Sequence, residues 1–522
     1  MNGQRRADRR PADRRAAPPG GVSGVGWAGR RAGIGDALGR VALGLAICFG
    51  LLAGGAGYWQ VIRASDLSRA PDDAAVIAAS RTTLRGAITD RDGNALATSQ
   101  RDANGETYRA YASPALSGVL GYASVQFGNS GLERAWDAQL SGVASEDPLY
   151  DLTRKFRADP SDPQAIQSTL VLSLQEAAVA ALGDNRGAVV MLNPTTGEVL
   201  ALASTPVFDA SAVANPATSA DTFQALQADA SLPLLPRATL GRYVPGSIFK
   251  IVTSMAALGS GAITVDTSYP EQPPAETDGL LVSGFRVRDG HHPATGDKQL
   301  TYPEAVEVSC NIYFALTGLK TGGATLVEYA DRVGFDAPTP FDLPTGVSQV
   351  TGGGGSFGGG FLDDVELANA AYGQAETLVT PLQMALVAAT VANGGVLMKP
   401  HLMLSATGHS GTRTVGPETL RQVIPGDVAA EITSAMQLAV EGKLGRQFTA
   451  GAQVDGLAVA GKTGTAQLDP GLNPHSWFIG FAPADHPQIA LAVIVEQGGH
   501  GSDRAAPIAG ELFRAWQAWA GG

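Results

Sequence analysis

The sequence predicts an α+β fold whose main sheet is antiparallel. Two short apolar runs, residues 187–192 and 198–203, flank the turn sequence Asn193–Gly197, a pattern typical of a hairpin. Two more apolar runs, residues 477–481 and 489–495, come near the end of the chain. The long stretch between the two pairs has mainly helical patterns. We therefore expect strands from both ends of one domain to meet in a single sheet.

Length and composition indicate a globular protein of two or three domains with a sizeable core. The chain has 522 residues, of which 44% are hydrophobic and 16% charged. Its two cysteines, Cys48 and Cys310, lie in different parts of the chain, so we expect no disulfide framework. The seven histidines show no spacing typical of a metal site. Neither a metal ion nor an organic cofactor is expected.

The N-terminal part predicts a membrane anchor. Residues 1–40 hold nine arginines and three aspartates, a net charge of +6, so the rest of this −12 chain carries −18. Residues 41–62 contain no charged side chain, and they are long enough to cross a bilayer core of about 30 Å. The arginines predict that residues 1–40 form a disordered cytoplasmic leader and that the remainder lies outside. A cleaved signal peptide is the alternative, but it is usually shorter. Anionic lipid suffices to explain the arginines, so no nucleic-acid partner is expected.

A change in periodicity near residue 166 divides the rest of the chain into two domains. Residues 63–165 begin with a linker and then a predicted hairpin that turns at Asp92-Gly93. They contain no cluster of histidine or cysteine, so we expect a non-catalytic stalk with a pedestal or dimerisation role. Residues 166–522 contain the predicted sheet and the reactive motifs, and we expect them to form the catalytic domain.

A serine and a lysine three residues apart form the first reactive motif. Ser247 and Lys250 precede the apolar run 251–258, which predicts a helix that starts near Pro245 and Gly246. Residues at this spacing share one helix face, so the hydroxyl and the amine can meet. A neutral lysine can take the proton of a serine and make it a nucleophile. The S-x-x-K pattern alone is common by chance.

Two later motifs complete an ordered set. Ser309-Cys310-Asn311 is followed by Lys462-Thr463-Gly464-Thr465. With S-x-x-K, these resemble the S-x-N and K-T-G motifs of penicillin-binding proteins and β-lactamases. Each motif is weak by itself, whereas the ordered triple is specific.

Further segments resemble class B penicillin-binding proteins in particular. The run Arg85–Ala97 has the pattern R-G-x-I-x-D-R-x-G-x-x-L-A that opens their extracytoplasmic part. Other segments similar to this family are Gly128–Glu133, Leu140–Gly142, Tyr372–Ala375, Val379–Ala385 and Ala392–Gly395. The resemblance covers the chain from about Leu84 to its end. It implies the transpeptidase fold, in which helices flank both sides of an antiparallel sheet and the nucleophile helix lies at its edge.

This resemblance implies an activity and its partners. The family comprises peptidoglycan D,D-transpeptidases, which cross-link the stem peptides of lipid-linked or nascent glycan, and which β-lactams acylate. Their usual membrane partner is a glycosyltransferase of the SEDS family. Such enzymes serve cell elongation, division or spore-related synthesis, and the sequence does not choose among these roles.

The resemblance also implies the steps of acyl transfer. Ser247 attacks the D-Ala-D-Ala bond and Lys250 accepts its proton. Ser309 passes a proton to the leaving amine, and Asn311 orients Lys250 and binds a substrate amide. Burial and the nearby ammonium of Lys462 are expected to lower the pKa of Lys250.

The K-T-G segment is expected to hold the substrate. Thr463 and Thr465 would bind its carboxylate, and Gly464 would leave the strand edge bare for an added peptide strand. The backbone N–H groups of Ser247 and Thr465 would form the oxyanion hole.

Two other classes of function share these motifs. A β-lactamase or D,D-carboxypeptidase uses the same acylation and then admits water. The 153 positions between Ser309 and Lys462 (462 minus 309) and the anchored stalk argue against a compact secreted β-lactamase. A β-lactam sensor or a silent scaffold is the second class. A sensor would need a larger cytoplasmic part than residues 1–40, and the intact motifs argue against a scaffold.

Overall fold

The structure is a computed structural model that describes residues 34–57, 84–102, 105–142, 162–289, 298–409 and 411–521. The chain forms two compact units, Met1–Val76 and Ile77–Gly522. In the first unit the described element is helix α1, Ile34–Gly57, which begins before the expected start at residue 41. Residues 1–33 of the predicted leader and residues 58–62 of the predicted anchor lie outside the described residues. Within the described part, no helix combines the length and hydropathy needed to cross a membrane.

A five-stranded antiparallel sheet forms the centre of the second unit, with strand order β15-β16-β17-β7-β8. Its strands are β7 Gly187–Leu192, β8 Val199–Thr205, β15 Ala460–Ala466, β16 His475–Ala482 and β17 Ile489–Val495. The pairing of β17 with β7 joins the two ends of the domain, as the sequence predicts. Strand β15 forms one edge of this sheet.

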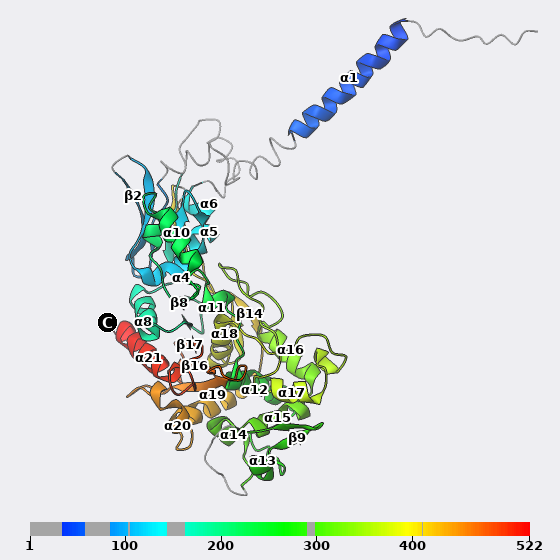
Figure 1. Cartoon of the computed structure of the whole chain (residues 1–522), viewed down its shortest axis with the longest axis vertical. Helices are drawn as coiled ribbons and strands as arrows, with labels where there is room; N and C mark the ends of the chain where they lie inside the picture. Colours follow the sequence, from blue (N-terminus) through cyan, green and yellow to red (C-terminus); the bar gives the residue numbers. More distant parts are fainter. Residues whose placement is uncertain are drawn as a thin grey trace, which may run out of the picture. The chain divides into compact units, whose positions relative to one another are not determined.

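Helices cover both faces of this sheet. Alternate residues of β7 point to opposite faces. Val189 and Met191 belong to the core cluster of helices α8 and α21, whereas Ala188 and Val190 belong to the cluster of α12 and α18. Figure 1 shows α21 near the strands β16 and β17, and α8 near β8. The predicted α+β fold, with a sheet flanked by helices, is thus confirmed. The bounds of these helices are α8 Leu172–Leu182, α12 Lys250–Gly259, α18 Pro381–Ala392 and α21 Ala505–Gly521.

A second sheet contains the predicted stalk hairpin. Its six strands have the order β13-β12-β6-β1-β2-β3. They are β1 Ile88–Thr89, β2 Ala95–Arg101, β3 Thr107–Tyr111, β6 Ala165–Ser168, β12 Met403–Gly408 and β13 Gly411–Thr414. The turn at Asp92-Gly93 is as predicted, because the Asp90 carboxylate accepts from the N–H groups of Asp92 and Asn94. The pairing of β12 with β6 was not predicted, because the two strands lie far apart in the sequence.

Short elements complete the stalk and the region that follows the central hairpin. They are η2 Pro114–Leu116, α4 Ser117–Leu120, β4 Ala123–Ser124, β5 Gly128–Asn129, α5 Gly131–Ala135, α6 Asp137–Leu140, α9 Ala210–Ala214, α10 Ser219–Ala228 and α11 Arg237–Leu240.

The middle of the chain is mainly helical, as its sequence pattern predicts. Its elements are η3 Gly246–Phe249, α13 Gln272–Asp278, β9 Leu280–Val282, β10 Phe285–Val287, α14 Tyr302–Val308, α15 Asn311–Thr321, α16 Gly323–Val333, η4 Gly358–Gly360, α17 Asp364–Ala370, β11 Val396–Met398, β14 Thr419–Gln422, α19 Gly426–Glu441, α20 Arg446–Thr449 and η5 Ala450–Ala452.

Candidate active site

Ser247 lies on a 3₁₀ turn at the start of a buried helix. This turn, η3, runs directly into α12, so Ser247 precedes the α-helix that the sequence predicts. Residues i and i+3 eclipse each other in a 3₁₀ turn, which places Ser247 and Lys250 on the same side. The Ser247 side chain is half-buried, and within the described part it makes no hydrogen bond. Its hydroxyl is therefore available to a substrate.

Glycines allow the serine turn to pack tightly against β15. Gly246 has φ +57°, and a Cβ on it would lie 2.6 Å from the carbonyl oxygen of Thr465. A Cβ on Gly464 would lie 2.8 Å from the carbonyl oxygen of Pro245. The indole N–H of Trp477 in β16 donates to the Val244 carbonyl oxygen at 3.0 Å and holds the same turn. Gly464 is thus required for close packing, a reason that differs from the bare strand edge expected from the sequence.

Lys250 is completely buried among residues of the S-x-N motif. Its Nζ donates to the carbonyl oxygen of Ser309 at 2.5 Å and to Asn311 Oδ1 at 2.8 Å. Ser309 Oγ lies 3.2 Å from the same nitrogen. The structure therefore brings the first two motifs together.

Ser309 lies between two lysines. Lys462 Nζ, from the edge strand β15, donates to Ser309 Oγ at 2.9 Å, so the third motif joins the same cluster. Ser309 has φ +63°, a left-handed conformation that few residues other than glycine adopt. Such conformations cost free energy and are concentrated at functional sites. Here the conformation turns the chain between α14 and α15 so that the hydroxyl can reach both amines.

Burial lowers the pKa of both lysines. It is the largest cause for Lys250, whose pKa falls to about 8 although the Asp289 carboxylate and the Cys310 thiol raise it in part. The pKa of Lys462 falls well below its ordinary value, first through burial and then through the ammonium of Lys250. Repulsion between two ammonium groups acts on both of them, so the expected effect of Lys462 on Lys250 stays a prediction. The oxygen acceptors around Lys250 Nζ favour its charged form, so they oppose the effect of burial on its pKa.

The two threonines of the K-T-G segment lie apart from the lysine cluster. Successive side chains of a strand point to opposite faces, so Thr463 and Thr465 face away from Lys462 and Gly464. Thr463 is buried, and Thr465 Oγ1 accepts from the N–H of Gly501 at 3.3 Å. The expected carboxylate-binding role of both threonines stays a prediction. The oxyanion hole is also a prediction, although the contact between Gly246 and the Thr465 carbonyl places the two backbones side by side.

Asp289 is a site residue that sequence analysis missed. Its carboxylate accepts from the backbone N–H of Asn311 at 2.6 Å and from the Cys310 thiol at 2.8 Å. It thus fixes the start of α15, which carries the S-x-N motif. Asp289 follows a short strand in a loop, and no motif or spacing distinguishes it in the sequence.

One group of side chains in the described part has atoms close enough to hold a metal ion. Glu276, Asp289 and Cys310 each offer one ligand atom, and these atoms lie within 4.8 Å of one another. Burial, followed by the Asp289 carboxylate, raises the pKa of the Cys310 thiol well above its ordinary value. The thiol therefore keeps its proton and donates it to Asp289, which does not suit a nucleophile.

Ser247 on a turn packed against an edge strand, together with two buried lysines that contact Ser309, is an arrangement typical of serine acyltransferases. Family models agree with this class. Residues 187–514 match the penicillin binding protein transpeptidase domain, and residues 85–161 match the penicillin binding protein A dimerisation domain. The chain belongs to the penicillin-binding protein transpeptidase family, as the sequence motifs predicted.

Relatives and solved structures agree with this assignment. The chain is 35% identical over 491 residues to the peptidoglycan D,D-transpeptidase PbpA of Mycolicibacterium smegmatis. The aligned region covers 91% of this chain and 95% of that protein. The PbpA of Mycobacterium tuberculosis is 34% identical over 471 residues, or 87% of this chain and 91% of that protein. The penicillin G acyl-enzyme complex of penicillin-binding protein A from M. tuberculosis superposes with a TM-score of 0.73 at 32% identity. It covers 83% of this chain and 100% of that chain.

Proposed function

We propose that this protein is a peptidoglycan D,D-transpeptidase that forms an acyl-enzyme at Ser247. The observation that carries the proposal is the cluster of Lys250, Ser309 and Lys462, whose Lys250 lies one 3₁₀ turn after Ser247. Two relatives of similar length bear the name peptidoglycan D,D-transpeptidase. A solved relative is an acyl-enzyme with penicillin G, which supports a serine that β-lactams also acylate.

The acylation step moves one proton along the cluster. Ser247 Oγ forms a bond to the carbonyl carbon of the penultimate D-alanine, and its proton passes to neutral Lys250. The C–N bond to the terminal D-alanine then breaks, and Ser309 Oγ supplies the proton that the leaving amine needs. Lys462 and Lys250 flank that hydroxyl and can restore its proton. An amine of a second stem peptide then attacks the ester and completes the cross-link.

The edge strand offers a place for the peptide substrate. β15 pairs only with β16 in the five-stranded sheet, so its outer backbone groups can take up a peptide as an added strand. The N–H groups of Ser247 and Thr465 would then stabilise the negative charge that develops on the attacked carbonyl oxygen, and each such donor contributes about 3 kcal/mol.

The N-terminal region is proposed to anchor the enzyme to the membrane. The net charge of +6 in residues 1–40 and the uncharged run 41–62 support a single-pass anchor with a cytoplasmic N-terminus. Residues 63–165 would form the stalk, and residues 166–522 the extracytoplasmic transpeptidase domain. A SEDS-family glycosyltransferase is the proposed membrane partner, and cell shape or division the proposed process.

Labelling with a fluorescent penicillin tests this function. We expect the full-length protein to be labelled and the Ser247→Ala variant to remain unlabelled. Ser260→Ala, which changes an exposed serine at the end of α12, should be labelled like the wild type. Intact-mass measurements then follow the adduct with time. An adduct that lasts for many minutes agrees with a transferase, whereas loss within seconds would identify a hydrolase.

A further inference from the structure

A pocket whose lining contains no residue of the three motifs lies elsewhere in the second unit. Its volume is about 570 Å³, and it opens between the stalk hairpin, the β7–β8 turn and the C-terminal helix α21. The residues that matter for its chemistry are Arg91, Asp92, Asn193, Gln488, Trp516 and Trp519. Its size falls within the range of about 300–1,000 Å³ that is typical of ligand sites. The pocket is therefore large enough for a small organic ligand.

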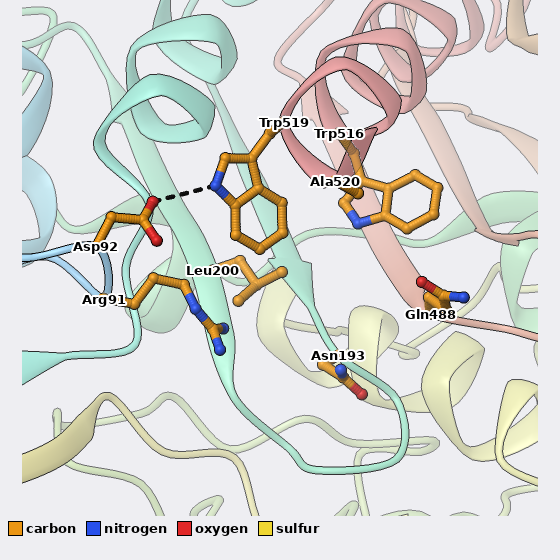
Figure 2. A pocket seen from close by; sticks show the side chains of 8 residues that line it. All are labelled: Arg91, Asp92, Asn193, Leu200, Gln488, Trp516, Trp519 and Ala520. Carbon is orange, nitrogen blue, oxygen red and sulfur yellow. Dashed lines mark hydrogen bonds between the residues drawn. The ribbon is translucent and has the colours of Figure 1, made fainter. Parts of the chain in front are cut away.

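Two indole rings form one wall of the pocket. Trp516 and Trp519 are three residues apart on α21 and so share one helix face. The Trp519 N–H donates to Asp92 Oδ2 at 3.1 Å, and the Arg91 guanidinium carbon lies 5.6 Å from the centroid of the same ring. Arg91 in turn pairs with Glu198 at 3.2 Å. Figure 2 shows both rings at the opening, with the Trp519–Asp92 hydrogen bond on one side. These contacts fix the orientation of Trp519 before any ligand arrives.

Unused amide groups lie across the opening from the rings. Asn193 Oδ1 accepts hydrogen bonds from its own turn, through the N–H of Thr195 at 2.9 Å, whereas its Nδ2 donates to no described group. The Gln488 side chain is exposed and makes no hydrogen bond within the described part. Figure 2 shows Asn193 and Gln488 below the two rings. Trp516 is 6% exposed and belongs to the core, so the pocket offers mainly the half-buried Trp519 ring together with amide donors and acceptors.

The charges at the pocket disfavour an anionic ligand. The guanidinium of Arg91 is balanced by Glu198, and the Asp92 carboxylate is engaged by Trp519. An anionic ligand would meet the charge of Asp92 and would have to displace Glu198 from Arg91.

We propose that this pocket binds a neutral N-acetylated sugar unit of the glycan strand. A sugar ring has an apolar C–H face that packs on an indole and a rim of hydroxyl and acetamido groups that bind amide side chains. The inference rests on the proposed function, because the stem peptides of peptidoglycan are attached to such a glycan. The pocket would then be a glycan-binding site that is separate from the site for the stem peptide.

A binding titration tests the pocket with a defined probe. Full-length protein in detergent micelles is titrated with tri-N-acetylchitotriose and followed by calorimetry. Gln488→Ala removes a free amide, and Asn193→Asp keeps the acceptor that holds the turn while it replaces the free donor. We expect each change to weaken binding about 3- to 10-fold, as for the loss of one hydrogen bond. Gln517→Ala, at an exposed position of α21 outside the pocket lining, should bind like the wild type.

Three results would overturn the pocket assignment. They are no binding by the wild type at millimolar probe, unchanged binding by both pocket variants, and competition at this pocket by a stem pentapeptide that carries no sugar. Penicillin labelling of the wild type is measured in parallel. If labelling succeeds and the sugar does not bind, the pocket inference fails and the proposed function stands. If the sugar binds and labelling fails, the proposed function fails instead.

Discussion

At the scale of single residues, the site depends on how two buried amines share one hydroxyl. Ser309 Oγ lies 2.9 Å from Lys462 Nζ and 3.2 Å from Lys250 Nζ. Lowering the pKa of Lys250 from 10.5 to about 8 costs roughly 3 kcal/mol at about 1.4 kcal/mol per unit. Packing elsewhere in the fold offsets this cost. As a consequence, Lys250 can be neutral near physiological pH.

The lowered pKa predicts how acylation depends on pH. The base acts when it is uncharged, and its uncharged fraction grows as the pH rises towards about 8. The rate of acylation by penicillin G should therefore rise about tenfold per pH unit below 8 and level off above it. Stopped-flow measurements between about pH 6 and 9.5 check this. A rate that is constant, or that falls, from pH 6 to 8 would contradict the role of Lys250 as base.

Replacing Asp289 should shift that profile. Its carboxylate raises the pKa of Lys250, so Asp289→Asn should lower that pKa and move the midpoint of the profile to lower pH. The asparagine oxygen can still accept from the N–H of Asn311, which limits damage to α15. Asp278→Asn, in α13, is the matched control and should keep the wild-type midpoint. A shift to higher pH would mean that Asp289 acts in another way.

At the scale of elements, the sequence predicts best where burial is complete. Strands β7 and β17 have the predicted bounds because every residue in them is apolar or glycine and buried. The 3₁₀ turn at Ser247 and the left-handed Ser309 were not predicted, since both conformations follow from contacts with distant segments. Likewise, every residue of β13 is exposed and β12 has only two buried residues, so their pattern does not indicate a place in the stalk sheet. The motifs predicted a cluster of Lys250, Ser309 and Lys462, whose contacts the structure shows, whereas the catalytic roles of these residues stay predictions.

A single methyl group at Gly464 should separate the serine turn from β15. The added Cβ would lie 2.8 Å from the Pro245 carbonyl oxygen and 3.0 Å from Ile248 Cγ2. Gly464→Ala should therefore destabilise the protein by about 1–3 kcal/mol and slow acylation more than tenfold. Gly416→Ala, which meets nothing within 4 Å, is the control for thermal unfolding and for acylation. Wild-type acylation by Gly464→Ala would show that the close approach is unimportant.

At the scale of the whole molecule, the predicted stalk and the predicted catalytic domain contribute strands to the same sheet. Residues 77–522 form one compact unit, and strands β12 and β13, from late in the chain, extend the sheet that holds the stalk hairpin. The Trp136 indole N–H in the stalk also donates to Asp342 at 3.2 Å. We therefore expect the two parts to unfold together.

A buried ion pair in the stalk tests this coupling. Glu133 is fully buried and binds Arg109 at 2.5 Å and Arg85 at 3.0 Å. Glu133→Ala leaves the buried Arg109 without its charge partner and should lower the free energy of unfolding by about 3–5 kcal/mol. Asp137→Ala removes a half-exposed partner of Arg85 and should cost about 1 kcal/mol or less. Urea unfolding should show one transition that moves as a whole, and two separate transitions would contradict the coupling.

The central claim is that three distant segments act together to make the Ser247 hydroxyl a nucleophile. Acylation kinetics with peptide mapping test this claim most directly. Penicillin G is reacted with the wild type, Lys462→Ala and the control Lys399→Ala, which changes an exposed lysine paired with Glu418. We predict a single adduct on the peptide that contains Ser247, a rate at least 100-fold lower for Lys462→Ala, and a wild-type rate for the control. An adduct on another residue, or a wild-type rate for Lys462→Ala, would contradict the account.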